Sequence, residues 1–189
     1  MSIMEELIFF FELQIKQMKE EIFITQSKYT GELLKKFRIE SSKSVSTPIT
    51  PSCKLDKDKH GKSVDSKFYR GMIGSLLYLI ANRPDIMFSI CMYAKFQSNP
   101  KESYLNAVKI FKYLKETQNP GLWFSKQSSI ELIGYSDTDF AGYRLDRKST
   151  SETCQFLKVN LISWFRKKQN LMALSIAEVE YITVESCCT

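Results

Sequence analysis

The sequence predicts an α+β protein, because strand-like segments at both ends of the chain flank three consecutive helical patterns. Hydrophobic residues make up 43% of the 189 residues, which is enough for one ordinary core or two small ones. Aromatic residues are frequent, so the chain as a whole is not a disordered tail. We see no internal repeat.

The first part of the chain, residues 1–40, predicts a strand pair followed by a short helix. Leu7–Phe11 and Ile22–Thr25 are rich in aromatic and β-branched residues, which predicts two strands joined by a tight turn. In the helix we expect Ser27 to be the cap, with Leu33 and Leu34 on the buried face. Residues 41–64 are rich in Ser, Thr, Pro and Lys and predict an exposed linker.

Residues 65–121 predict three helices that share a core. Asp65 can cap the first helix, Pro84 can start the second, and the third ends at Asn119-Pro120-Gly121. The apolar residues expected in this core are Phe68, Met72, Leu76, Leu79, Ile86, Ile90, Tyr93, Tyr104, Ala107, Val108, Phe111 and Leu114.

Residues 122–189 predict a sheet followed by a helix. Strand candidates cover residues 122–124, 130–135, 153–158 and 161–166, and the last two fit a hairpin around Val159-Asn160. The final segment, residues 175–188, predicts a helix with Glu180 inside its apolar stripe. The members of this stripe are Ile176, Ala177, Tyr181, Val184, Cys187 and Cys188.

Composition excludes several classes of protein. Five scattered cysteines without CxxC spacing argue against a disulfide framework and a zinc site, and indicate a reducing compartment. The single histidine, His60, lies in a lysine-rich stretch and is expected to be solvated. The longest apolar run, from Gly71 to Asn82, is shorter than the roughly 20 residues that cross a membrane. The net charge of +6 permits binding to a polyanion.

Two acidic positions are candidates for metal chemistry. Asp137 and Asp139 would share one face if the strand continued that far, although Asp137-Thr138-Asp139 could equally be the turn that ends it. Glu180 could form an ordinary salt bridge at the edge of its stripe. The order of strand aspartate, hairpin and helix glutamate favours a metal site, because this topology can bring Asp137 and Glu180 together to hold Mg²⁺.

A series of motifs covers the whole chain in a fixed order. These motifs are Gln26-Ser27-Lys28-Tyr29, Ser46-Thr47-Pro48, Tyr69-Arg70-Gly71-Met72-Ile73-Gly74, Arg83-Pro84-Asp85, Tyr135-Ser136-Asp137-Thr138-Asp139, Asp146-Arg147-Lys148-Ser149-Thr150-Ser151, Lys167-Lys168-Gln169 and Ala177-Glu178-Val179-Glu180-Tyr181. The series resembles the Pol polyprotein of copia-type long-terminal-repeat retrotransposons.

The resemblance implies a division of the chain. Residues 1–40 would be the end of the reverse transcriptase palm and thumb, residues 41–64 a linker, residues 65–121 a helical connection, and residues 122–189 a truncated ribonuclease H-like domain with a mixed sheet and a helix. By position, Asp137 and Glu180 match the first two catalytic and metal-binding acids of this family.

The resemblance also sets the expected activity. The family enzymes use Mg²⁺ or Mn²⁺ and act on RNA–DNA hybrids in RNA-directed DNA synthesis and hybrid hydrolysis. The family's later acidic ligands fall beyond Thr189 and its polymerase Tyr-x-Asp-Asp motif falls before Met1, so we expect metal binding to be doubtful and the isolated chain to be inactive. The alternatives are a non-catalytic nucleic-acid-binding module, or a structural fragment that pairs with a partner chain or self-associates through its truncated sheet. We expect a cytoplasmic or nuclear location and no membrane partner.

Basic residues near these motifs are candidates for phosphate binding, although ordinary solvated side chains are the alternative. The candidates are Arg144, Arg147, Lys148, Arg166, Lys167 and Lys168. Two positions depart from the family pattern, because Glu12 and Glu152 stand where it has glycine. A glutamate at either position would be strained by roughly 1–2 kcal/mol if the glycine served a turn with positive φ.

Overall fold

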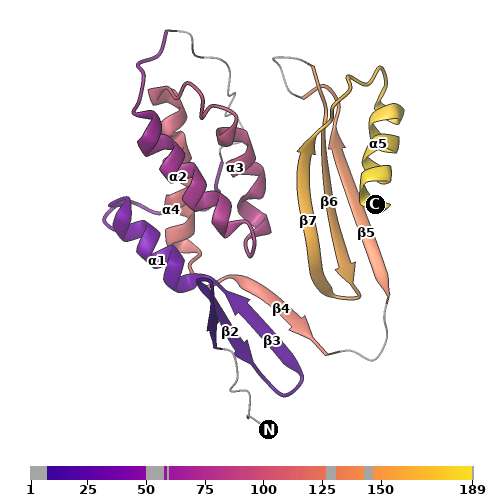
Figure 1. The fold of residues 1–189 in the computed structure, drawn as a ribbon, viewed down its shortest axis with the longest axis horizontal. Helices are drawn as coiled ribbons and strands as arrows, with labels where there is room; N and C mark the ends of the chain where they lie inside the picture. Colours follow the sequence, from indigo (N-terminus) through magenta and orange to yellow (C-terminus); the bar gives the residue numbers. More distant parts are fainter. Residues whose placement is uncertain (1–7, 50–57, 59, 127–130, 143–146, 189) are drawn as a thin grey trace. The chain divides into compact units, whose positions relative to one another are not determined.

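A computed structural model describes residues 8–49, 58, 60–126, 131–142 and 147–188. Contacts divide the chain into two compact units, Met1–Trp123 and Phe124–Thr189, which are coloured along the sequence in Figure 1. Each unit contains helices and strands, and the two sheets are antiparallel. The α+β class is therefore confirmed. No helix among these residues has the length and apolar character needed to cross a membrane.

The N-terminal sheet contains four strands: residues 7–25 form three rather than the two predicted, and the fourth is the strand predicted at residues 122–124. In spatial order they are β1 (Phe9–Phe10), β2 (Leu13–Gln17), β3 (Glu21–Thr25) and β4 (Gly121–Ser125). Phe11 and Glu12, with φ of 45° and 61°, reverse the chain between β1 and β2. The prediction missed β2 because this reversal carries no glycine to mark it.

The helices of the first unit surround one hydrophobic core. They are α1 (Ser27–Lys36), α2 (Ser66–Leu79), α3 (Met87–Ala94) and α4 (Val108–Glu116), with 3-10 turns at Pro84–Ile86 and Glu102–Ala107. Most of the predicted core residues are buried, but Phe68 is 48% exposed and Val108 is only partly buried. Tyr69, the next residue along α2, takes the fully buried position instead of Phe68.

Helix starts were predicted with mixed success. Asp65 caps α2 as predicted, since its Oδ1 accepts a hydrogen bond from the backbone N of Lys67 at 2.9 Å. Ser27 does not cap α1, because the cap position belongs to Gln26. The Ser27 hydroxyl instead donates to Oε1 of Gln14 at 2.7 Å, which ties α1 to β2.

An ion pair between a buried arginine and a partly exposed aspartate joins the turn before α3 to the end of α4. The guanidinium of Arg83 donates from Nε and Nη2 to the two carboxylate oxygens of Asp85 at 2.8 and 2.7 Å. The same group donates to the backbone O and the hydroxyl of Thr117, just beyond α4. The Tyr113 hydroxyl also donates to Asp85 at 2.9 Å. The Arg83-Pro84-Asp85 motif therefore has a structural role in this unit.

The second unit is a three-stranded sheet with one helix packed against it (Figure 1). Its elements are β5 (Leu132–Asp139), β6 (Thr150–Leu157), β7 (Asn160–Lys168) and α5 (Ile176–Cys188). The strand order is β5-β6-β7 and both pairings are antiparallel. The prediction of a mixed sheet is wrong for the described residues, because β6 and β7 form a hairpin and no parallel strand joins them.

Helix α5 presents a different face to the sheet from the one predicted. Val179 and Thr183 are buried, whereas Ile176, Tyr181 and Val184 of the predicted apolar stripe are 59%, 78% and 49% exposed. The sheet face beneath α5 is polar, since Ser151 and Gln155 both hydrogen-bond to the helix. Because this sheet face is polar, the helix packs Thr183 against it rather than the apolar stripe. The predicted buried stripe is therefore wrong.

Candidate metal and nucleic-acid site

Strand β5 runs through Asp139, so Asp137-Thr138-Asp139 is strand rather than turn. Asp137 is exposed, and its Oδ1 accepts a hydrogen bond from the backbone N of Thr138 at 2.8 Å. Asp139 Oδ1 accepts from the backbone N of Thr150 at 2.6 Å. Asp139 therefore ties the end of β5 to the start of β6.

The structure brings the two predicted metal ligands to one cavity. Asp137 from β5 and Glu180 from α5 both line a cavity of about 280 Å³. The other lining residues are Ser136, Thr138, Thr183 and Val184. Glu180 is exposed, so its carboxylate meets this cavity from the solvent side of the helix. The polar lining suits a hydrated ligand better than an apolar one.

The cavity lies at the sheet edge that β5 forms. The hydroxyls of Ser151 and Thr183 are 2.8 Å apart, so Ser151 and its cross-strand partner Thr138 lie on the face that α5 covers. Asp137 is paired with Glu152, and neighbouring strand residues point to opposite faces. The Asp137 side chain therefore leaves β5 on the face opposite α5, and it borders the cavity at the edge of the sheet.

Glu152 gives Asp137 a charged neighbour that sequence reasoning did not identify. Its Oε1 lies 3.1 Å from Nε of Arg166, the residue paired with it on β7. Burial raises the pKa of Glu152, and repulsion from Asp137 and Asp139 adds to this rise while Arg166 opposes it. Glu152 sits in a regular strand without positive φ, so the turn strain considered for this position does not arise. The hairpin predicted around Val159-Asn160 would pair Glu152 with Lys167, and the observed register, with its irregularity between Gln155 and Phe156, pairs it with Arg166 instead.

The carboxylates suit Mg²⁺ or Mn²⁺ in type but fall short in number. Both ions prefer oxygen ligands, and the cavity offers Asp137 and Glu180. Across the described parts of the chain, no three His, Cys, Asp or Glu side chains gather in a way that could hold a metal ion. A two-metal centre does not fit these residues, because each ion would keep too few protein ligands.

The candidate phosphate-binding residues occupy different environments. Arg144 lies outside the described residues, Arg147 is exposed, and the Lys148 amine donates to the backbone O of Asn170. The Arg166 side chain is only 4% exposed and is paired with Glu152. Lys167 and Lys168 end β7 and are paired with Ser151 and Thr150 at the start of β6, the strand that begins three residues after Arg147.

The basic side chains and the carboxylate cavity lie at the same end of the sheet. Asp137 to Asp139 are paired with residues 150–152, which are in turn paired with residues 166–168. This arrangement sets positive charge next to a carboxylate cavity. Such a surface can attract a phosphate backbone and hold it beside the two acids.

Comparison with known proteins finds transposon relatives. The chain is 36% identical over 181 residues to "Retrovirus-related Pol polyprotein from transposon RE1" of Arabidopsis thaliana, which covers 95% of this chain and 12% of that protein. It is 35% identical over 170 residues to the corresponding polyprotein of transposon TNT 1-94 of Nicotiana tabacum, covering 86% of this chain and 13% of the relative. It thus spans about an eighth of the length of these polyproteins.

A third relative is shorter. The chain is 31% identical over 175 residues to "Uncharacterized mitochondrial protein AtMg00810" of Arabidopsis thaliana, which covers 92% of this chain and 72% of that protein. No family model matches the chain. No solved structure matches it either.

Proposed function

Since the chain belongs to the family of retrovirus-related Pol polyproteins of copia-type transposons, we propose that it is a segment of their reverse transcriptase and ribonuclease H region. In this proposal residues 1–40 are the end of the polymerase, residues 41–64 a linker, residues 65–121 a helical connection and residues 122–189 a ribonuclease H-like domain. Three antiparallel strands followed by a helix across the sheet support the last assignment.

One observation carries the proposal. Asp137 and Glu180 come from different elements, yet both line one cavity, as a metal-dependent nuclease requires of its acids. The parent chemistry is RNA-directed DNA synthesis together with metal-dependent hydrolysis of RNA in an RNA–DNA hybrid. We therefore propose that the Asp137–Glu180 site derives from a nuclease active site.

We assign this chain nucleic-acid binding without catalysis of its own. Two carboxylates are too few to position two ions, a water molecule and a leaving oxygen. Mg²⁺ or Mn²⁺ would bind weakly and keep most of its water ligands. Arg147, Lys167 and Lys168 would hold a hybrid or another nucleic acid through its phosphates. Its place of action would be the cytoplasm, the nucleus or both.

Cleavage of a labelled RNA–DNA hybrid with Mg²⁺ or Mn²⁺ tests this proposal. We expect no product above the protein-free control from the wild-type chain or from Asp137→Asn, while both chains bind the hybrid. Cleavage that disappears in Asp137→Asn would overturn the assignment of inactivity and support the metal site. The matched variant Glu131→Gln removes a carboxylate outside the cavity and checks that any loss is specific.

A second candidate function is that of a structural fragment that pairs with a partner chain or with itself. Strand β5 is a sheet edge that carries exposed Leu132 and Tyr135, and the neighbouring α5 exposes Tyr181 and Val184. An exposed strand edge beside apolar side chains favours association with another chain. Light scattering after size exclusion tests this function. A concentration-dependent dimer that Val184→Asp disrupts would support it, whereas a monomer at all concentrations would exclude self-association.

A further inference from the structure

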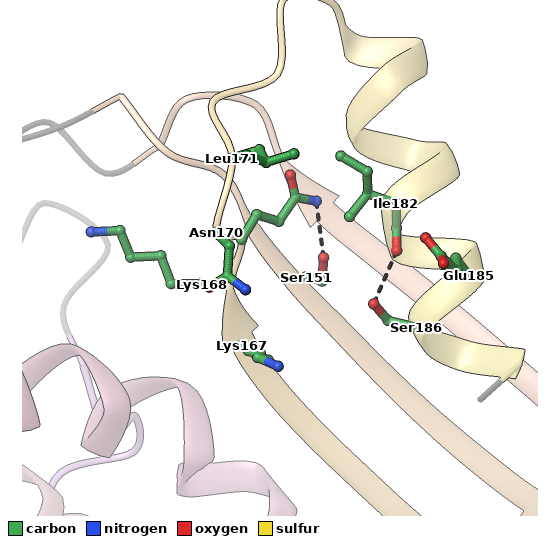
Figure 2. A pocket seen from close by; sticks show the side chains of 9 residues that line it. Ser151, Lys167, Lys168, Asn170, Leu171, Ile182, Glu185 and Ser186 are labelled. Carbon is green, nitrogen blue, oxygen red and sulfur yellow. Dashed lines mark hydrogen bonds between the residues drawn. The ribbon is translucent and has the colours of Figure 1, made fainter.

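A second pocket lies between the end of β7 and the C-terminal half of α5, as Figure 2 shows. Its volume is about 240 Å³, and neither Asp137 nor Glu180 lines it. The lining residues that matter here are Ser151 from β6, Lys167 and Gln169 at the end of β7, Leu171 in the following loop, and Glu185 from α5. The transposon relationship assigns no role to this pocket.

A chain of hydrogen bonds fixes the orientation of the Gln169 amide. Thr183 donates its hydroxyl hydrogen to the backbone O of Val179 at 2.8 Å, so Ser151 must donate to Thr183 across their 2.8 Å contact. Gln169 Nε2 then donates to Ser151 Oγ at 3.0 Å and to the Val179 carbonyl at 3.2 Å. A flipped amide would place Oε1 against these oxygens, which have no hydrogen left to donate to it.

The fixed amide leaves one acceptor unused. Gln169 is 6% exposed, and its Oε1 has no hydrogen-bond partner among the residues that the structure describes. A buried acceptor without a donor is costly, so this atom favours an occupant that brings a hydroxyl or an amine. Access needs a small movement of the lining. Leu171, which is 69% exposed, can rotate into solvent at little cost in buried area.

Two charged residues that line the same pocket narrow the choice of ligand. The Glu185 carboxylate on α5 is a second acceptor, and Lys167 supplies a cation. Lys167 is paired with Ser151 and therefore lies on the face of the sheet that α5 covers. Figure 2 shows the Lys168 side chain extending away from α5, so the two lysines serve different faces. The pocket thus combines two acceptors with Lys167 on the same face, while Lys168 also lines it from the other side of β7.

We propose that this pocket binds the ribose of a ribonucleotide through its 2′,3′-diol. The 2′-hydroxyl donates to Oε1 of Gln169, the 3′-hydroxyl donates to Glu185, and the phosphate is attracted to Lys167. The choice of a nucleotide among phosphorylated diols rests on the proposed function. A free nucleoside 5′-monophosphate and the 3′ end of an RNA strand share this chemistry.

The volume of the pocket limits what enters it. About 240 Å³ lies below the roughly 300–1,000 Å³ of pockets that enclose a drug-sized molecule. The sugar therefore enters while the base stays outside. This predicts that adenosine and uridine 5′-monophosphates bind with similar affinity.

Titration of the ¹⁵N-labelled full chain with adenosine 5′-monophosphate, followed by NMR, tests the inference. We expect shifts at the backbone amides of Gln169, Asn170 and Leu171. The 2′-deoxy analogue should bind about tenfold more weakly or worse, because it leaves Oε1 unpaired. The 3′-deoxy analogue should also bind more weakly. Equal binding of the three compounds would mean that the pocket does not recognise the diol, and no shifts at millimolar ligand would mean that it holds only water. Either result would overturn the inference.

Surface variants test the same site without disturbing the buried amide. Lys167→Gln and Glu185→Gln should each weaken monophosphate binding several-fold, whereas Lys158→Gln at the opposite end of the hairpin should not. Equal effects of Lys167→Gln and Lys158→Gln would contradict the site. The diol could come from a free nucleoside 5′-monophosphate or from the 3′ end of an RNA strand. An RNA oligonucleotide with a 3′-phosphate separates these two sources, because it lacks the free diol at its end.

The result is separable from that of the proposed function. Hybrid binding without monophosphate binding would remove the pocket and leave the nucleic-acid proposal. Monophosphate binding without hybrid binding would support the pocket and remove that proposal.

Discussion

Glu12 holds a left-handed backbone conformation, with φ of 61°, at the reversal between β1 and β2. A side chain in this region costs about 1–2 kcal/mol, whereas glycine adopts it freely but loses more entropy on folding. We therefore expect Glu12→Gly to raise the free energy of unfolding by about 1 kcal/mol. Urea denaturation followed by circular dichroism measures the change.

Glu20 is the matched control for this prediction. It is an exposed glutamate in the turn between β2 and β3, and it is not among the residues with positive φ. Glu20→Gly should therefore destabilise the chain slightly through the added entropy of the unfolded state. A loss of stability in Glu12→Gly equal to that in Glu20→Gly would show that the left-handed conformation carries no strain.

The carboxyl group of Glu152 reports the charge on Asp137. Burial raises the pKa of Glu152, and repulsion from Asp137 adds to the rise, so Asp137→Asn should lower that pKa. A raised folded pKa gives stability that is present below the unfolded pKa and is lost as pH rises through the folded pKa. Asp137→Asn should make this loss smaller. NMR titration of the Glu152 carboxyl carbon measures the shift, and Glu131→Gln should leave it unchanged.

At the candidate site, topology alone was enough to predict that the two acids lie at one place, while their role as metal ligands stays a prediction. A strand aspartate and a later helix glutamate can meet only if the helix crosses the sheet, and Asp137 and Glu180 do line one cavity. Glu152 beside Asp137, and Gln169 in the second pocket, were missed because their environments depend on strand register and on a buried hydrogen-bond chain. Neither feature has a local sequence signal.

The Arg83–Asp85 pair acts at the scale of the helical elements, because it links the start of α3 to the end of α4 through Thr117. The Arg83 side chain is buried, and removal of one partner leaves a buried charge. We expect Asp85→Ala to lower the free energy of unfolding by about 2 kcal/mol, because Asp85 is partly exposed and Arg83 keeps its hydrogen bonds to Thr117. A double-mutant cycle with Arg83→Ala should give a coupling energy above about 1 kcal/mol, and additive losses would contradict the link.

The same pair makes stability depend on pH. Burial alone would raise the pKa of Asp85, but hydrogen bonds and attraction from Arg83, aided by Tyr113, lower it below the ordinary value. A lowered folded pKa gives stability that is present above the unfolded pKa, about 3.9, and is lost as pH falls through the folded value. Acid unfolding of Asp85→Asn should consequently be shallower than that of the wild-type chain.

Prediction of the elements succeeded where periodicity was strong and failed where packing decided. The helical core followed from apolar spacing, and Asp65 capped α2 as its side chain suggested. The prediction of the buried face of α5 was wrong because the sheet surface beneath it is polar and hydrogen-bonds to Thr183. Strand β2 was missed because its entry turn uses Phe11 and Glu12 in place of glycine.

At the scale of the whole molecule, the net charge of +6 makes binding to nucleic acid depend on salt. We expect three phosphate contacts, from Arg147, Lys167 and Lys168, which lie at one end of the sheet in the second unit. Release of condensed ions then weakens hybrid binding by a factor of about 30–50 between 50 and 200 mM salt. Fluorescence anisotropy of a labelled hybrid measures the slope of log affinity against log salt concentration.

Two variants test which side chains make these contacts. Lys167→Gln combined with Lys168→Gln should remove two phosphate contacts and make this slope shallower by about 2. Arg166→Gln should leave the slope unchanged, because Arg166 is buried against Glu152. A salt-independent affinity would contradict phosphate binding by this basic cluster.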